Sequence, residues 1–346
     1  MEKKILRAGL VGLGGMGRGH LGNYLKFNAE GDIIELVAVC DIDPSKFEKA
    51  DIKFNLESEK NDADCSAFRR YTSMDDMLAN EELDMVTIAL PTYLHCEATV
   101  KFLEAGVHVL CEKPMGLTLE QCDTMIETAK RCGKQLMIGQ CLRFWEEYRQ
   151  LKQIVEDGTY GKPLSGFFYR GGQTPRWNVD GVENWYLKKE CGGGAIIDQH
   201  VHDVDMVQYL YGMPKAVSSV GMVVHPGCNF ETVTTNYIYE DGKSINAQND
   251  WNWTGQPFFM GYRANFAEGS VRWENGQFIK AGPGEKMTQY ELAKSNAYYN
   301  ETRYFAECIR DGKENTINPP ESSRDTIRLV LAEIASCEQN GAPVEL

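Results

Sequence analysis

Long apolar runs, low-complexity tracts and internal repeats are absent from this sequence of 346 residues. No stretch approaches the ~18 consecutive apolar residues that a membrane-spanning helix needs, and the mean hydropathy is -0.40. We therefore expect no membrane partner. With 42% hydrophobic and 25% charged residues, the chain has the composition of an ordinary globular protein that is long enough for two cores.

Positive charge is also scarce, because 36 Lys and Arg face 50 Asp and Glu for a net charge of -14. Such a surface repels phosphate backbones, so we expect no nucleic-acid partner. The eleven cysteines are an odd number and contain no Cys-x-x-Cys pair, which favours reduced thiols over a disulfide framework or a zinc ribbon. Glycines, and no Leu-rich core, follow Lys3-Lys4, so we expect a cytoplasmic protein without a signal peptide.

Residues 1–141 alternate short apolar runs with segments of helical periodicity, which predicts a doubly wound parallel sheet of the Rossmann type. The expected strands are Ile5–Val11, Glu35–Cys40, Asp84–Leu90, Val107–Cys111 and Gln135–Ile138. The expected helices lie near Met16–Phe27, Ser73–Ala79, Tyr93–Ala105 and Thr118–Arg131. We expect this first domain to bind a dinucleotide.

Residues 142–346 change to longer strand-like segments, which predicts an α+β domain with a large open, mainly antiparallel sheet. The expected strands are Leu164–Gly172, Lys215–Val224, Glu231–Glu240, Lys243–Trp253, Phe258–Ala267 and Ser270–Trp273. The expected helices are Arg143–Glu156, Ala195–Tyr211, Glu291–Arg310 and Ser322–Glu338. A broad sheet face without a helix layer must be solvated or paired, so this domain is expected to bind substrate and to form a homo-oligomer.

A glycine fingerprint, Gly12-x-Gly14-x-x-Gly17, falls between the first expected strand and the first helix. There, Gly12 permits a tight turn, Gly14 lets the backbone approach a pyrophosphate, and Gly17 lets the helix pack closely on the strand. The diphosphate would sit on the helix N-terminus. We predict that these glycines, with Gly15 and Met16, bind the cofactor.

Asp41 ends the second expected strand, 24 residues after Gly17. A carboxylate at this offset can accept hydrogen bonds from the adenosine ribose hydroxyls and would repel a 2′-phosphate. Asp43 adds a second negative charge. The sequence therefore favours NAD over NADP; a mere cap of the turn is the alternative role of Asp41.

Several longer motifs resemble those of the Gfo/Idh/MocA oxidoreductases, which include glucose–fructose oxidoreductase and inositol dehydrogenases. They are Val11–His20, Ala89–His95, Glu112-Lys113-Pro114, Arg143-Phe144, Gly161-Lys162-Pro163, the run from Gly192 to Asp205 and the final segment from Tyr298 to Gly341. The resemblance covers nearly the whole chain and is specific at the level of the family. Members of this family act on many sugars, polyols and related compounds, so it does not identify the substrate.

Lys113 follows a buried parallel strand whose carboxyl end is expected to face the cofactor crevice. A lysine there could stabilise negative charge that develops on a reacting oxygen, or it could be a surface ammonium beside a loop proline. The resemblance implies that Lys113 is catalytic and that Glu112 lies with it near the nicotinamide. It also implies that Pro91, Thr92 and His95 line the dinucleotide.

A second polar cluster lies on the expected helix Ala195–Tyr211, where Asp198, His202 and Asp205 fall within about 60° of one another. The rest of that helix is largely apolar, so the charged stripe needs partners or a function. A self-satisfied structural His–Asp pair is the alternative. For oxidation of a carbinol, His202 suits the general acid/base because its unperturbed pKa lies near neutrality, and Asp198 suits orientation of the imidazole, a substrate hydroxyl or a proton relay. The resemblance supports both roles.

His200 stands where many relatives have glycine. The run of Asp and His invites a metal site, but His200 points about 160° away from His202 on a regular helix. We therefore expect no metal. The role of His200, which could touch substrate or the cofactor half, stays open.

Aromatic and polar side chains suited to a sugar are concentrated in two further segments. They are Arg170, Gln173, Arg176, Trp177 and Trp185 in the first, and Asn249, Trp251 and Trp253 in the second. We predict substrate contacts from Arg170, Trp177 and Trp185, together with Asp198 and His202. Trp251 and Trp253 share a strand face and could equally belong to the core or a subunit contact.

These observations predict NAD-dependent oxidation of a secondary hydroxyl of a sugar, glycoside or cyclitol to the ketone, or the reverse reaction. One alternative is an enzyme that retains NAD and oxidises a sugar transiently to cleave a glycosidic bond. A second alternative is a non-catalytic NAD-binding sensor. The resemblance makes a homodimer or homotetramer plausible.

Overall fold

The computed structural model describes residues 4–48, 64–175 and 184–346, and they form two compact units. The first comprises Met1–Cys141 with Asn296–Ser323, and the second Leu142–Ser295 with Arg324–Leu346. The expected division into 1–141 and 142–346 differs from this in one segment, because Asn296–Ser323 lies with the first unit. No helix in the described ranges combines the length and the apolar character needed to cross a bilayer.

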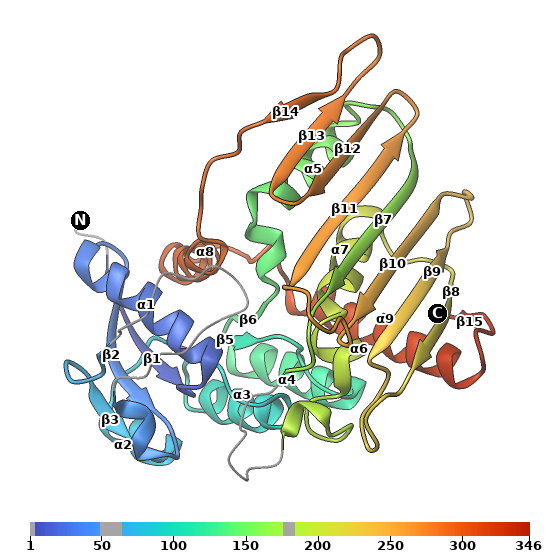
Figure 1. The fold of residues 1–346 in the computed structure, drawn as a ribbon. Coiled ribbons are helices and arrows are strands. Elements are labelled where there is room, and N and C mark those ends of the chain that lie inside the picture. The colour runs from blue at the N-terminus through green and yellow to red at the C-terminus, as the bar shows by residue number, and fades with distance from the viewer. Residues whose placement is uncertain (1–3, 49–63, 176–183) are drawn as a thin grey trace. The chain divides into compact units, whose positions relative to one another are not determined.

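The first unit is built on a parallel sheet in the order β3-β2-β1-β4-β5-β6 (Figure 1). Its strands are β1 Leu6–Val11, β2 Ile34–Cys40, β3 Arg69–Tyr71, β4 Met85–Ile88, β5 His108–Glu112 and β6 Leu136–Gly139. β4 and β6 are buried along their whole length, as expected for a sheet covered on both faces. The strand order reverses between β1 and β4, which is where doubly wound folds bind their ligands.

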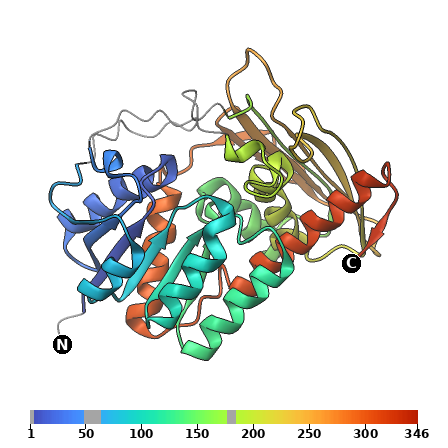
Figure 2. The same cartoon turned by 90° about the horizontal axis from the view of Figure 1, so that it is seen from below.

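Helices flank this sheet on both sides. They are α1 Gly15–Glu30, α2 Met74–Asn80, α3 His95–Glu104, α4 Leu119–Cys132 and α8 Ala297–Asp311. Figure 2 shows α3 and α4 side by side, while α1 and α8 contact each other, with the rings of Phe27 and Tyr299 stacked at 4.2 Å. The predicted Rossmann fold is therefore confirmed.

The second unit holds a mixed sheet in the order β14-β13-β12-β11-β7-β10-β9-β8-β15. The strands are β7 Pro163–Gly171, β8 Ala216–Met222, β9 Thr232–Ile238, β10 Ser244–Asp250, β11 Phe259–Phe266, β12 Gly269–Glu274, β13 Gln277–Ala281, β14 Thr288–Tyr290 and β15 Val344–Glu345. Within the described residues, β7 and β10 pair in parallel and the other neighbours are antiparallel. This confirms the predicted large, mainly antiparallel sheet.

The helices of the second unit gather on one face of its sheet (Figure 1). They are α5 Glu146–Asp157, α6 Gly194–Asp198, α7 Val201–Tyr211 and most of α9, which spans Pro320–Glu338 and begins in the first unit. On that face, β11 places the buried ring of Tyr262 against Tyr148 of α5, with ring centres 5.2 Å apart.

The predicted continuous helix Ala195–Tyr211 is wrong, because α6 ends at Asp198 and α7 begins at Val201. The amides of Gln199 and His200 both donate to the carbonyl oxygen of Ala195, at 2.9 and 2.8 Å.

Candidate active site

The glycine turn of the first unit has the geometry that a dinucleotide needs. Gly12 has a φ of +89°, and a Cβ on Gly17 would lie 1.8 Å from the carbonyl oxygen of Gly12, so helix and strand approach as only glycine permits. Gly14 is the N-cap of α1, is exposed, and has no atom within 4 Å of the position of a Cβ. Gly15 and Met16 open the helix behind it. An anion can therefore reach the amides of the helix N-terminus.

Asp41 lies directly after β2, beside this turn. Its carboxylate accepts hydrogen bonds from the amides of Leu13 at 2.7 Å and Asp43 at 2.9 Å. Each carboxylate oxygen keeps a second lone pair, which suits the two hydroxyls of an adenosine ribose. Nearby, the buried guanidinium of Arg18 donates to the carbonyl oxygens of Lys46 and Glu48 and so holds the loop that follows Asp41. The residues present fit the adenosine half of NAD.

Pro91 and Thr92 follow β4, and His95 begins α3; Thr92 and His95 are buried. Each ring nitrogen of His95 lies 2.8 Å from a backbone carbonyl oxygen, that of Pro114 and that of Leu90. His95 therefore connects the loops that follow β4 and β5, and burial lowers the pKa of its imidazole. Its predicted contact with the dinucleotide stays a prediction.

Glu112 ends β5 and Lys113 follows it, and the peptide bond from Lys113 to Pro114 is cis. The Glu112 carboxylate lies 2.7 Å from Nε2 of His20 on α1 and accepts a 3.2 Å hydrogen bond from the Lys113 amide. Both members of the His20–Glu112 pair are buried, whereas Lys113 is partly exposed. Glu112 thus ties the backbone of Lys113 to the fingerprint helix.

In the second unit, Asp198 and His202 flank the break between α6 and α7, and both are partly exposed. Asp205 does not share their position: its buried carboxylate forms hydrogen bonds of 2.9 and 2.7 Å with Arg143 and accepts one from Thr326 at 2.9 Å. The predicted three-residue stripe is therefore interrupted between Asp198 and His202, and its third member, Asp205, is bound to Arg143 and Thr326.

The substrate contacts predicted from the sequence lie in different settings. The guanidinium of Arg170 is only 3% exposed and forms hydrogen bonds of 2.6 and 2.8 Å with Asp203, so its observed contact anchors α7. Trp185 is partly exposed, and its ring stacks on Tyr186 at 3.8 Å. Trp177, like Arg176, lies outside the described residues. Contact of Arg170, Trp177 or Trp185 with substrate stays a prediction.

His200 turns away from the side chains that were expected to do chemistry. It is fully buried, and its Nε2 lies 3.3 Å from Oε2 of the equally buried Glu333 on α9. Where the chain is described, no three His, Cys, Asp or Glu side chains gather as ligands of a metal ion would. The sequence did not point to Glu333; the only signal is a charge inside the apolar run Leu329–Ile334.

Two models of known protein families match this chain. Residues 6–140 match a family model described as "Oxidoreductase family, NAD-binding Rossmann fold", and residues 148–272 match the "GFO/IDH/MocA C-terminal domain". The first unit therefore contains an NAD-binding Rossmann domain. The chain belongs to the Gfo/Idh/MocA oxidoreductase family, which confirms the resemblance seen in its motifs.

Two curated relatives show different activities. D-glucoside 3-dehydrogenase of Escherichia coli is 33% identical over 64% of this chain and 58% of the relative. The 2,7-anhydro-N-acetylneuraminate hydratase of Mediterraneibacter gnavus is 32% identical over 63% of this chain and 54% of the relative. The chain thus spans only a little over half the length of these relatives.

Solved structures match over almost the whole chain. Levoglucosan dehydrogenase in complex with NADH and levoglucosan has a TM-score of 0.85 and covers 99% of both chains at 19% identity. At this identity the match bears on the fold alone.

Three alanine substitutions test the cofactor turn. Gly17→Ala should destabilise the fold by about 3–5 kcal/mol or prevent folding, because its Cβ meets the Gly12 carbonyl. Gly14→Ala should leave thermal unfolding unchanged yet weaken NAD at least about tenfold in calorimetry, because the methyl group enters the open space over the helix N-terminus. Gly19→Ala, in the same helix and equally unobstructed, is the control and should change neither. Wild-type NAD affinity in Gly14→Ala would exclude this turn as the diphosphate site.

Proposed function

We propose that the protein is an NAD-dependent dehydrogenase that oxidises a secondary hydroxyl of a sugar, glycoside or cyclitol to the ketone, or runs the reverse reaction. The observation that carries the proposal is the pairing of two features in one chain. The first is the dinucleotide turn with a fixed carboxylate at Asp41. The second is a set of three partly exposed ionisable side chains, Lys113, Asp198 and His202, in a family of oxidoreductases.

Gly12, Gly14, Gly15, Met16 and Gly17 would hold the diphosphate. Asp41 would hold the adenosine ribose. Pro91, Thr92, His95, Glu112 and Lys113 would surround the nicotinamide end. When bound, NAD supplies the acceptor for a hydride from the substrate carbon.

The side chains of the protein supply the proton chemistry. His202 accepts the hydroxyl proton during oxidation and returns it during reduction. The Lys113 ammonium stabilises negative charge on the reacting oxygen, and Asp198 orients the imidazole or binds a neighbouring hydroxyl. Trp177 and Trp185 would stack on apolar faces of the substrate. Arg170 would either contact the substrate directly or support the site by anchoring α7.

A second candidate reaction is suggested by the relative that is named a hydratase, because hydration involves no net oxidation. An enzyme of this kind would keep its NAD and oxidise the sugar only transiently to assist cleavage of a glycosidic or anhydro bond. Release of product without accumulation of NADH would identify it. A non-catalytic NAD sensor is disfavoured because Lys113, Asp198 and His202 are all present.

The catalytic assignment predicts the behaviour of single variants in an NADH absorbance assay with glycosides, inositols and anhydrosugars. His202→Ala and Lys113→Met should each lower kcat by about 10²- to 10⁴-fold at neutral pH, because proton transfer or oxyanion stabilisation is lost. Lys101→Met, which removes a lysine paired with Asp75 on the surface, is the control and should retain activity. Turnover near that of the wild type in His202→Ala would remove His202 from the role of base.

We propose that NAD is preferred over NADP because the charge of Asp41 opposes a 2′-phosphate. Asp41→Asn keeps an oxygen that can accept from the Leu13 amide but loses the charge. Its ratio of NAD to NADP affinity, measured by calorimetry, should fall at least about tenfold. Asp43→Asn is the matched control and should have a smaller effect, since Asp43 is exposed and accepts from the amide of Ser45. An unchanged ratio in Asp41→Asn would refute this origin of the preference.

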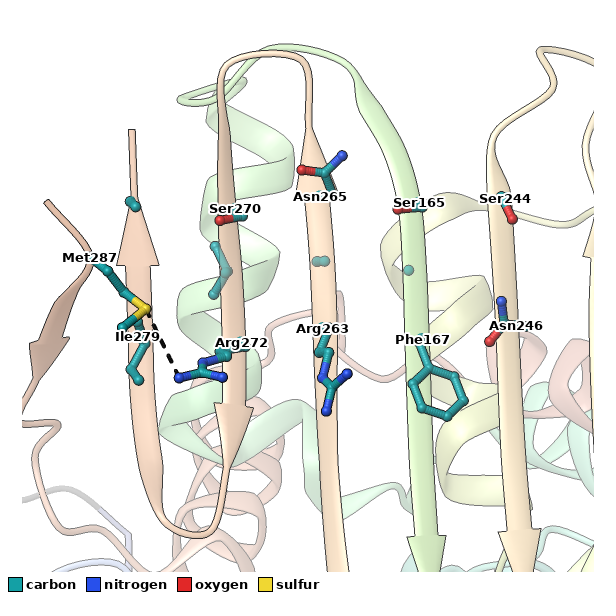
Figure 3. A pocket seen from close by; sticks show the side chains of 14 residues that line it. Ser165, Phe167, Ser244, Asn246, Arg263, Asn265, Ser270, Arg272, Ile279 and Met287 are labelled. Atoms are coloured by element: carbon teal, nitrogen blue, oxygen red, sulfur yellow. Dashed lines mark hydrogen bonds between the residues drawn. The ribbon is translucent and has the colours of Figure 1, made fainter. Parts of the chain in front are cut away.

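We also propose a homodimer or homotetramer formed through the sheet face of the second unit that its helices leave open. Figure 3 shows side chains of β10, β7, β11, β12 and β13 on this face, around a hollow of about 430 Å³. Phe167, Arg263 and Arg272 are among them, and a sheet face of this width must be solvated or paired. A cytoplasmic location is proposed as well, because all eleven cysteines lie in the described residues and none forms a disulfide.

Light scattering at micromolar concentration tests the oligomer. The wild type should have the mass of two or four chains, and Phe167→Glu should reduce it because it buries a charge in the proposed contact. Leu164→Glu, on the same strand but on the opposite face and 44% exposed, is the control and should keep the wild-type mass. A monomeric wild type would refute the proposal.

A further inference from the structure

The break between α6 and α7 sets how Asp198 and His202 are presented. On a continuous helix, residues four apart lie on one face, about 40° from each other. Here the carbonyl oxygen of Ala195 accepts from two successive amides, and His200 caps the new helix, with its own carbonyl accepting from Asp203 at 2.9 Å. The relation between Asp198 and His202 therefore depends on the two residues of the break, Gln199 and His200.

Gln199 is fixed by the sheet. The indole Nε1 of Trp251 donates to Oε1 of Gln199 at 2.9 Å, and Nε2 of Gln199 donates to Oδ1 of Asn249 at 2.7 Å. Since an indole nitrogen can only donate, the first bond sets the orientation of the Gln199 amide, and the second then follows. Asn249 and Trp251 are buried at 0% and 1% exposure, so both partners are rigid.

His200 is fixed by α9. Its imidazole and the carboxylate of Glu333 are both fully buried with 3.3 Å between their nearest atoms. The pair lacks the geometry of a hydrogen bond, but two polar side chains buried this close together would each be costly to separate without solvent, so their contact restrains both elements. Tyr237 of β9 lies near the same carboxylate, and burial together with the charge of Glu333 raises the pKa of its hydroxyl well above the usual value.

We propose that Gln199 and His200 are positioning residues that hold the break and thereby fix the Asp198 carboxylate and the His202 imidazole in their reactive arrangement. The proposal rests on the proposed function, which makes Asp198 and His202 catalytic. Gln199 is attached to the sheet through Asn249 and Trp251, and the next residue, His200, contacts the C-terminal helix α9 through Glu333. Movement of the break would therefore require both attachments to give way.

The test compares Gln199→Leu and His200→Leu with Gln208→Leu in the NAD-loaded enzyme. Gln208 belongs to α7 and its amide also donates to a buried partner, Thr326, so its substitution removes a contact of similar kind away from the break. We expect the first two variants to lose about 10- to 100-fold in kcat, because small misplacement of reacting groups is costly, while NAD affinity is unchanged. Gln208→Leu should keep its kcat.

A conservative double variant tests whether the contact between His200 and Glu333 itself sets kcat. His200→Gln with Glu333→Gln replaces the His200–Glu333 contact by two amides that can bond to each other, and it should recover most of the kcat that His200→Leu loses. A role in stability alone predicts the opposite pattern, in which the three leucine variants lower the unfolding temperature and none lowers kcat.

A readout without substrate separates this inference from the proposed function. The NMR titration of the His202 imidazole, assigned by its loss in His202→Gln, should shift by at least about half a pH unit in Gln199→Leu and His200→Leu and not in Gln208→Leu. If the wild type oxidises no polyol but these shifts occur, the positioning stands and the function fails. If the wild type is active and neither kcat nor the titration changes in the break variants, the inference is wrong.

Discussion

Buried charge beneath α7 is the constraint on which the second unit depends. Asp203 and Asp205 are fully buried, and each is held through two oxygens by an arginine, Arg170 in one case and Arg143 in the other. Removing one partner of such a pair leaves an uncompensated charge at a cost of about 3–5 kcal/mol, so these contacts fix the helix against β7 and the start of the domain. Of the three acidic side chains in the run from Gly192 to Asp205, Asp198 is the one that stays partly exposed.

The first unit fixes its loops by close backbone packing at its glycines together with the buried His20–Glu112 pair. The contact of Gly17 with the Gly12 carbonyl sets the start of α1, and that helix carries His20, which holds Glu112 and with it the backbone of Lys113. His95 links the two loops on which the nicotinamide end would rest. The cofactor turn and the backbone of Lys113 are thus linked by one chain of contacts within the first unit.

The sequence predicted the elements whose signals are local or periodic. The apolar parallel strands, the fingerprint and the strand-rich second half were all recognised, because each depends on residue types within a short window. Strand β3 was missed because Arg69–Tyr71 is short and exposed at the sheet edge. The break at Gln199 could not be predicted because helical periodicity continues through it, and the partners of its two residues, Trp251, Asn249 and Glu333, come from distant segments. For the same reason the partners of Arg170 and Asp205 could not be predicted from the sequence.

A crystal structure of the protein with NAD and a polyol bound would test the central claim most directly. The account predicts that the Lys113 ammonium and the His202 imidazole both lie within hydrogen-bond reach, about 3 Å, of one substrate hydroxyl whose carbon faces the nicotinamide ring. An adenosine ribose bound away from Asp41, or a nicotinamide with His202 and Lys113 more than ~10 Å apart on different sides of the ring, would contradict it.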